Sequence, residues 1–306
     1  MSWPPLPLDS WRDTRDTLQM WTQMAGKICL ALTPRVNHFW NITFHITSRG
    51  LMTPQLPYGG RMFAMTFDFL EHALVIESSD GRREAVPFRP ESVADFYGRF
   101  MAALHRMDID VRIWTMPVEF PEPIRFEQDT VHRSYDPAAA GRFWEILVTI
   151  KPVLEAFRAE FIGKCSPVHF FWGGFDVAVT RFSGRRAPER PGADAVTRES
   201  YSHEVISHGW WAGSGAVDQP AFYAYAAPEP AGLKTAAIRP ASAFYSNEMS
   251  IFVLPYDAVR TSATPEADVR AFLDSTYDTA ATLARWDRNS LERAAVARVS
   301  APKGDV

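Results

Sequence analysis

The sequence is poor in cysteine: Cys29 and Cys165 are the only two among 306 residues, and they lie far apart without Cys-x-x-Cys spacing. Neither a disulfide framework nor a thiolate zinc site is indicated, and each cysteine is expected to be a small buried side chain. No apolar run approaches the roughly 20 residues of a membrane-spanning helix, and the first residues lack the cationic and apolar parts of a signal peptide. We therefore expect a soluble, cytoplasmic protein with no membrane partner.

The chain also lacks blocks of charge: no five like charges follow one another, and the formal net charge is -4. A nucleic acid partner is not expected, because surfaces that bind nucleic acids are strongly basic. The glycine-rich patterns that bind phosphates or dinucleotides are absent, and so is the nucleophile elbow of α/β-hydrolases. The sequence therefore names no cofactor.

Metal-binding patterns are scarce as well. The nearest is His203-Glu204-Val205-Ile206-Ser207-His208, whose histidines are five residues apart, whereas a zinc-protease helix needs a spacing of four. On a strand, side chains five apart point to opposite faces, so this pair cannot hold one metal. A site built from His169, Asp176 and His203 is chemically possible, but we predict no metal.

Aromatic residues are abundant instead: the chain has 10 tryptophans, 21 phenylalanines and 9 tyrosines. These rings can form a thick core. Some of them can also line a cavity, because the walls of small-molecule sites are often aromatic. Both interpretations stay open at this point.

The spacing of apolar residues predicts helices and strands in both halves of the chain. Apolar residues at helical intervals predict helices over about residues 11–26, from Pro90, from Pro137 and from Pro265. Alternation of polar and apolar residues predicts strands, and a stretch rich in Pro, Gly and Arg between them predicts a loop. The strands are expected over 37–47, 61–69, 72–78, 111–114, 169–182 with a bulge at Gly173-Gly174, 201–207, 221–226 and 249–254, and the loop over 183–200.

Strands joined by short turns, with helices before and after them, favour the α+β class: an antiparallel or mixed β-sheet with helices packed on one side. Prolines and the lack of a clear period predict a linker or surface crossing over 115–136. The chain is thus divided into an N-terminal lobe over 1–114 and a C-terminal lobe over 137–306, within one full-length module. The two lobes have a similar order of elements, for which an internal duplication is one explanation.

The strand expected over 37–47 has a polar face that carries Asn37, Asn41, Thr43 and His45, with Arg49 just beyond it. Such a row of hydrogen-bonding side chains needs either water or a ligand. Either this face is exposed to solvent, or the second lobe closes over it and makes it the floor of a cleft.

The second lobe offers titratable groups on its predicted strands, among them Asp176, His203 and Glu204. A histidine titrates near neutrality, but Glu204 directly follows His203 and so points to the other face of a strand. The expected acid–base pair is therefore His203 or His45 with Asp176 or Asp68.

Three arginines, Arg181, Arg185 and Arg186, surround Ser183-Gly184. They can hold a carboxylate or phosphate as a fork, or they are solvated loop charges. The candidate residues for substrate binding are Asn37, Asn41, Arg49, Trp172, Arg181, Arg185, Arg186, Tyr201 and Glu204.

Several segments together resemble an uncharacterised bacterial family that is catalogued as a domain of unknown function. The resemblance covers nearly the whole chain and implies a single full-length module, but it implies no activity. It rests on Trp3-Pro4-Pro5-Leu6-Pro7, Asn37-His38-Phe39-Trp40-Asn41, Phe171-Trp172-Gly173-Gly174-Phe175-Asp176, Arg181-Phe182-Ser183-Gly184-Arg185-Arg186-Ala187-Pro188 and Tyr201-Ser202-His203-Glu204.

The sequence thus favours a small-molecule enzyme that uses His and Asp side chains as acid and base on a polar or anionic substrate in an aromatic-lined cleft. A non-catalytic protein that binds or senses a small ligand in the same cleft is the alternative. A third possibility is an interaction protein with an exposed aromatic surface. No pattern in the sequence indicates an oligomeric state.

Overall fold

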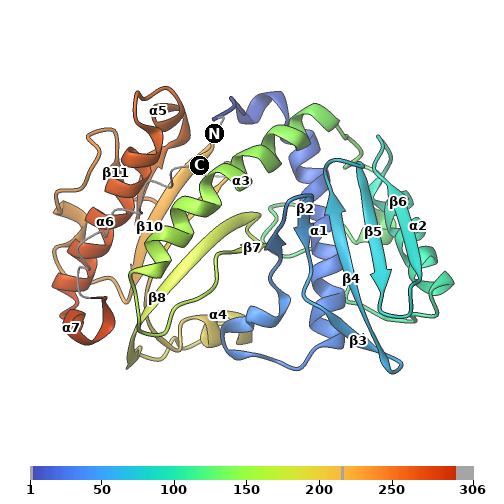
Figure 1. The fold of residues 1–306 in the computed structure, drawn as a ribbon, viewed down its shortest axis with the longest axis horizontal. Coiled ribbons are helices and arrows are strands. Elements are labelled where there is room, and N and C mark those ends of the chain that lie inside the picture. Colours follow the sequence, from blue (N-terminus) through green and yellow to red (C-terminus); the bar gives the residue numbers. More distant parts are fainter. Residues whose placement is uncertain (1–2, 215–216, 294–306) are drawn as a thin grey trace, which may run out of the picture.

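The computed structural model describes residues 3–214 and 217–293, which form two six-stranded sheets with helices packed against them (Figure 1). All strand pairs in both sheets are antiparallel. The predicted α+β class is therefore confirmed, in its antiparallel form. Within the described residues, no helix has both the length and the apolar composition that crossing a bilayer requires.

The N-terminal sheet has the strand order β1-β2-β4-β5-β6, and β3 pairs with the beginning of β4. In β4 the buried Phe63, Met65 and Phe67 alternate with more polar neighbours, as the sequence predicts for a strand that packs one face on a core. The strands are β1 (His45–Ile46), β2 (Gly50–Met52), β3 (Leu56–Tyr58), β4 (Arg61–Asp68), β5 (Ala73–Ser78) and β6 (Arg83–Pro87).

The C-terminal sheet has the order β11-β12-β10-β9-β8-β7. Its register places Asp176 opposite Trp211, and Tyr223 opposite Gly209. Because side chains alternate, Asp176 and Tyr223 lie on one face of this sheet, while Val177 lies on the other face with the main core. The strands are β7 (His169–Phe171), β8 (Asp176–Arg186), β9 (His203–Trp211), β10 (Ala221–Ala227), β11 (Phe244–Ser246) and β12 (Ile251–Pro255).

The longer helices begin where the sequence offers capping residues. Ser92 accepts a hydrogen bond from the backbone N–H of Asp95, and Asp136 accepts one from Ala138 with Pro137 in the first turn. The helices are α1 (Arg12–Leu32), α2 (Val93–Arg106), α3 (Pro137–Ala159), α4 (Ala195–Ser200), α5 (Tyr256–Arg260), α6 (Pro265–Leu283) and α7 (Arg288–Leu291), with 3-10 turns η1 (Leu8–Ser10), η2 (Asn37–Ile42), η3 (Phe126–Gln128) and η4 (Leu233–Thr235).

One connected core joins both sheets. Helix α3 crosses the molecule and contacts β8 of one sheet and β1 of the other, while α6 packs on β9 and β10 (Figure 1). On α3, the ring of Phe143 is fully buried and lies next to the rings of Trp11 at the N-cap of α1, Phe69 just after β4 and Trp210 in β9. The two sheets are therefore held together by side chains and not by the connecting chain alone.

The prediction of a strand over 37–47 is wrong for most of that segment, because residues 37–42 form the 3-10 turn η2 and only His45–Ile46 is a strand. His38 and Phe39 have left-handed backbone angles, with φ of 58° and 56°. The segment packs against α1 and α4 and satisfies its backbone locally, as when the Phe39 N–H donates to the Val36 carbonyl at 3.0 Å. Polar–apolar alternation here reflects these contacts and not a sheet.

Three smaller predictions also differ from the structure. Residues 111–114 form no strand, Gly173-Gly174 lies in the turn of a β7–β8 hairpin instead of a bulge, and the 183–200 segment contains the end of β8 and helix α4. The two sheets differ in their strand order, and internal duplication stays a hypothesis.

Candidate functional site

The turn between β7 and β8 is fixed by helix α1. The Gln19 side-chain amide donates to the Gly173 carbonyl at 2.5 Å, and the Trp172 indole N–H donates to the Ile42 carbonyl at 2.8 Å. The Trp172 ring lies so close to α1 that a Cβ on Gly26 would overlap it. Glycine at position 26 thus lets the helix and the hairpin turn dock closely.

The same helix holds a second segment against this turn. The Gln23 amide accepts from the Val118 N–H and donates to the Val118 carbonyl, both at 2.8 Å. The next residue, Glu119, has a left-handed backbone with φ of 52° and extends its carboxylate over Gly173 and Gly174. A loop with no regular period is therefore placed by a buried glutamine.

Two carboxylates approach Gly174. A Cβ built on this glycine would stand 3.0 Å from Asp176 Oδ1 and 3.4 Å from Glu119 Oε2, so both oxygens lie around one point. Asp176 begins β8 directly after the hairpin turn. The absence of a side chain at Gly174 leaves room for the carboxylate pair.

Tyr223 reaches Asp176 from β10, two strands away. Its hydroxyl donates to Asp176 Oδ2 at 2.5 Å. The ring crosses the intervening strand β9 at Gly209, where a Cβ would overlap both the Tyr223 ring and the Val177 carbonyl. Glycine in the middle of β9 is thus what allows this hydrogen bond.

The surroundings of Asp176 favour its protonated form near neutral pH. Burial and the charge of Glu119 raise the pKa of Asp176 to about 7, against the opposing effect of the hydrogen bond from Tyr223. Residue Glu119 is exposed, but loss of water around its carboxylate over the hairpin turn raises its pKa, and the charge of Asp194 raises it further. The site therefore combines a carboxyl group that can give a proton with a second that can accept one.

Hydroxyl groups and rings continue along the same sheet face. The hydroxyls of Tyr201 and Tyr225 are 3.1 Å apart, and those of Thr180 and Ser207 are 2.8 Å apart. Tyr225 stacks on Tyr223, with ring centroids separated by 6.1 Å. This is a polar, aromatic sheet face of the kind expected from the sequence, although it lies on the C-terminal sheet and not on residues 37–47.

The predicted acid–base residues do not come together. Asp176 pairs with Trp211, eight residues beyond His203 on β9, so His203 and Asp176 are about 26 Å apart at about 3.3 Å per residue. His45 is exposed in β1. Asp68 accepts hydrogen bonds from the backbone of Leu70 and Glu71 and from Arg49, and so stabilises a turn of the N-terminal sheet. Of this set, only Asp176 lies at the carboxylate pair.

The predicted binding residues also separate into different places. The Asn41 amide donates to Thr33 at 2.8 Å and its oxygen accepts from the Val36 N–H at 3.2 Å, which holds the chain after α1. Asn37 lies in the same 3-10 turn. Trp172 lies at the hairpin turn with its indole packed on α1, while Tyr201 and Tyr225 meet on the sheet face that carries Asp176.

The three arginines do not form a fork. Arg181 is buried, donates to the Phe157 carbonyl and lies over the rings of Phe157 and Tyr277. Arg185 donates to Glu204 and to two carbonyls after α6. Arg186 pairs with His203 in the β8–β9 ladder, and its guanidinium has no hydrogen-bond partner in the part of the chain that the structure describes. The expected anion-binding arrangement is therefore not formed.

The metal site considered from the sequence is not assembled either. His169 Nδ1 is 2.8 Å from the Thr43 hydroxyl, and burial lowers its pKa to about 3, so the ring is neutral. Among residues 3–214 and 217–293, no group of three or more His, Cys, Asp or Glu side chains is placed to hold a metal ion.

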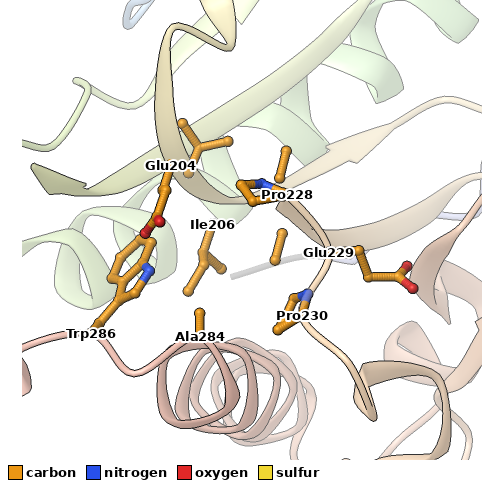
Figure 2. Close-up of a pocket in the computed structure, with 10 residues that line it drawn as sticks. Glu204, Ile206, Pro228, Glu229, Pro230, Ala284 and Trp286 are labelled. Carbon is orange, nitrogen blue, oxygen red and sulfur yellow. The ribbon is translucent and has the colours of Figure 1, made fainter. Parts of the chain in front are cut away.

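A cavity of about 200 Å³ lies on the opposite side of the C-terminal sheet, near its end (Figure 2). Its walls come from the beginning of β9, the end of β10 with the following prolines, and the chain after α6. Glu204, one of the predicted binding residues, lines this cavity and lies away from the carboxylate pair.

The sequence did not predict three parts of this site: Glu119, Tyr223 and the glutamines of α1. Glu119 lies in a segment without periodicity, and Tyr223 has the appearance of an ordinary strand residue. Two glycines could have indicated the site, because glycine in or beside a strand often marks a close approach to the backbone. At both Gly174 and Gly209 another side chain approaches the backbone closely.

Comparison with known proteins gives a family but no activity. A family model described as "Family of unknown function (DUF5996)" matches residues 3–293, nearly the full chain. No curated protein and no solved structure matches. The expected resemblance to a family of unknown function is thereby confirmed.

Proposed function

Because this chain belongs to DUF5996, a family of unknown function, we propose its activity from the geometry of its residues: it is a small-molecule enzyme in which Asp176, paired with Glu119, transfers a proton. The observation that carries the proposal is the approach of both carboxylates to Gly174, where a Cβ would stand 3.0 Å from Asp176 Oδ1 and 3.4 Å from Glu119 Oε2. Burial, together with the nearby charge of Glu119, raises the pKa of Asp176, so this carboxyl group can remain protonated as an acid while Glu119 acts as a base.

The surroundings favour an uncharged or cationic ligand over an anion. Asp194 adds a third negative charge that acts on Glu119. Within the described residues, neither Glu119 nor Asp176 forms an ion pair with a basic side chain. The rings of Trp211 and Tyr223 on the same face suit the apolar surface of a sugar-like molecule or an amine. Of the polar and anionic substrates that the sequence favours, we therefore propose the polar ones, either uncharged or cationic, and not the anionic ones.

The proposal is tested with a panel of small sugars, polyols and amines, matched by carboxylates and phosphates of similar size. Binding is measured by saturation-transfer NMR, and compounds that bind are then followed for chemical conversion. We expect uncharged or cationic compounds to bind. We expect Asp176→Asn to reduce turnover by about 100-fold or more, the usual contribution of a general acid or base, while binding persists.

Two results would decide against the proposal. If only the anionic compounds bind, the assignment of ligand class is wrong. If uncharged compounds bind to wild type and none is converted, the protein is a non-catalytic binder, which is the alternative that the sequence left open.

The raised pKa of Asp176 predicts a pH dependence of stability. Its folded-state pKa of about 7 exceeds the ordinary carboxyl value, so the stability that its protonated form provides is present at low pH and is lost as the pH rises through about 7. The amide side chain introduced by Asp176→Asn cannot ionise, so this variant does not lose stability in this way. Its free energy of unfolding minus that of wild type should therefore rise between pH 5 and pH 8.

Urea unfolding at several pH values measures this difference, with Glu119→Gln as the matched variant. Removing the charge of Glu119 should lower the pKa of Asp176 and move the pH dependence to more acidic values. A difference between Asp176→Asn and wild type that is constant from pH 5 to pH 8 would contradict the assigned pKa.

A further inference from the structure

The cavity at the end of the C-terminal sheet has apolar walls. Ile206 and Ala284 line it together with Pro228 and Pro230. Figure 2 shows Glu204 and Trp286 on one side of the cavity, the two prolines on the other, and the side chain of Glu229 directed away. A ligand here would place its apolar body against carbon and meet polar atoms on one side only.

Two polar atoms at this cavity lack partners. Glu204 Oε2 accepts from the Ser183 hydroxyl at 2.9 Å and from Arg185 at 2.7 Å, but Oε1 has no hydrogen bond within the described residues. The Trp286 indole N–H has none within the same residues, although its side chain is only 7% exposed. One acceptor and one donor are therefore available to a ligand.

Arg185 joins the two walls of the cavity. It binds the Glu204 carboxylate, and it also donates to the Ala284 carbonyl at 2.6 Å and to the Arg285 carbonyl at 3.2 Å. These carbonyls follow the end of α6, where a cation is favourable. The acceptor on β9 and the donor of Trp286 are thus held in a fixed relation before any ligand binds.

We propose that this cavity is a binding site for a small ring compound that carries an N–H donor beside a carbonyl acceptor, as a lactam does. The N–H would donate to Glu204 Oε1, and the carbonyl would accept from Trp286 Nε1. The size agrees with this class, because a cavity of about 150 Å³ already holds a benzene-sized ring.

The site is separate from the carboxylate pair. Glu204 and Ile206 face the side of the sheet opposite to Asp176, and Glu204 lies about 23 Å along β9 from the residue that pairs with Asp176, at about 3.3 Å per residue. Failure of one site to bind its ligand therefore says nothing about the other.

The test is a titration of ¹⁵N-labelled protein with 2-pyridone, followed through the indole N–H signals. The signal of Trp286 is identified by its loss in Trp286→Phe. We expect this signal to move saturably with 2-pyridone, and we expect N-methyl-2-pyridone, which lacks the donor, to bind about ten-fold more weakly because one hydrogen bond is lost.

Two variants provide controls. Ala284→Leu fills the cavity and should abolish the shift, whereas Glu229→Gln changes a side chain that points away and should leave it intact. The proposal is overturned if the Trp286 signal does not move at any soluble concentration, or if both pyridones bind equally. It is also overturned if Ala284→Leu still binds while its other indole signals keep their wild-type positions.

Discussion

Replacing Gly26 by alanine is expected to lower the free energy of unfolding by about 3 kcal/mol, because the added methyl group overlaps the Trp172 indole. The indole has little freedom to move away, since it is buried and its N–H is bound to the Ile42 carbonyl. Either α1 or the β7–β8 turn must shift. The change is measured from the urea concentration at which half of the protein is unfolded.

Gly98 provides a matched control for this substitution. It also lies within a helix, α2, but a Cβ at this position would meet no atom within 4 Å. Gly98→Ala should therefore stabilise the protein by about 0.5–1 kcal/mol, through helix propensity alone. Two glycine-to-alanine changes in helices thus have opposite expected signs, and equal effects would show that the overlap at Trp172 is not real.

Replacing Phe143 by alanine should destabilise the protein by about 3–5 kcal/mol, the usual cost of emptying a buried phenylalanine site. The ring is fully buried and lies 5.0 Å from Phe175, 5.4 Å from Trp11 and 6.2 Å from Phe69, counted between ring centroids. Since these partners belong to different parts of the fold, the loss should reduce the contact between the two sheets. Denaturant unfolding followed by tryptophan fluorescence measures it.

Val148 is the control on the same helix. It is 38% exposed, so Val148→Ala should change stability by no more than about 0.5 kcal/mol. If the Phe143 and Val148 variants unfold at similar denaturant concentrations, then the core does not depend on α3 in the way described.

The sequence predicts best the elements whose signals are local. Strand β4 follows from alternation, and α3 follows from Asp136, Pro137 and the apolar stripe behind them. The 3-10 turn at 37–42 cannot be predicted this way, because its residues alternate as in a strand while their conformation is set by contacts with α1 and α4. A pattern of period two is compatible with both outcomes.

The candidate site was predictable only in part. Asp176 and Trp172 belong to one recognisable segment of the chain, and both lie at the β7–β8 turn. Their partner Glu119 is invisible to any local pattern, because Gln23 on α1 fixes its position through a pair of long-range hydrogen bonds. Likewise, the separation of His203 from Asp176 depends on strand register, which a sequence does not state.

The double hydrogen bond between Gln23 and Val118 has a practical consequence for work with fragments of this protein. It makes the position of Glu119 depend on the first helix, while Asp176 and Tyr223 come from the second half of the chain. Cutting the gene between the two sheets would thus separate Gln23 from Asp176, so neither piece would hold Glu119 in its position beside Asp176. Any assay for its chemistry should use the intact polypeptide.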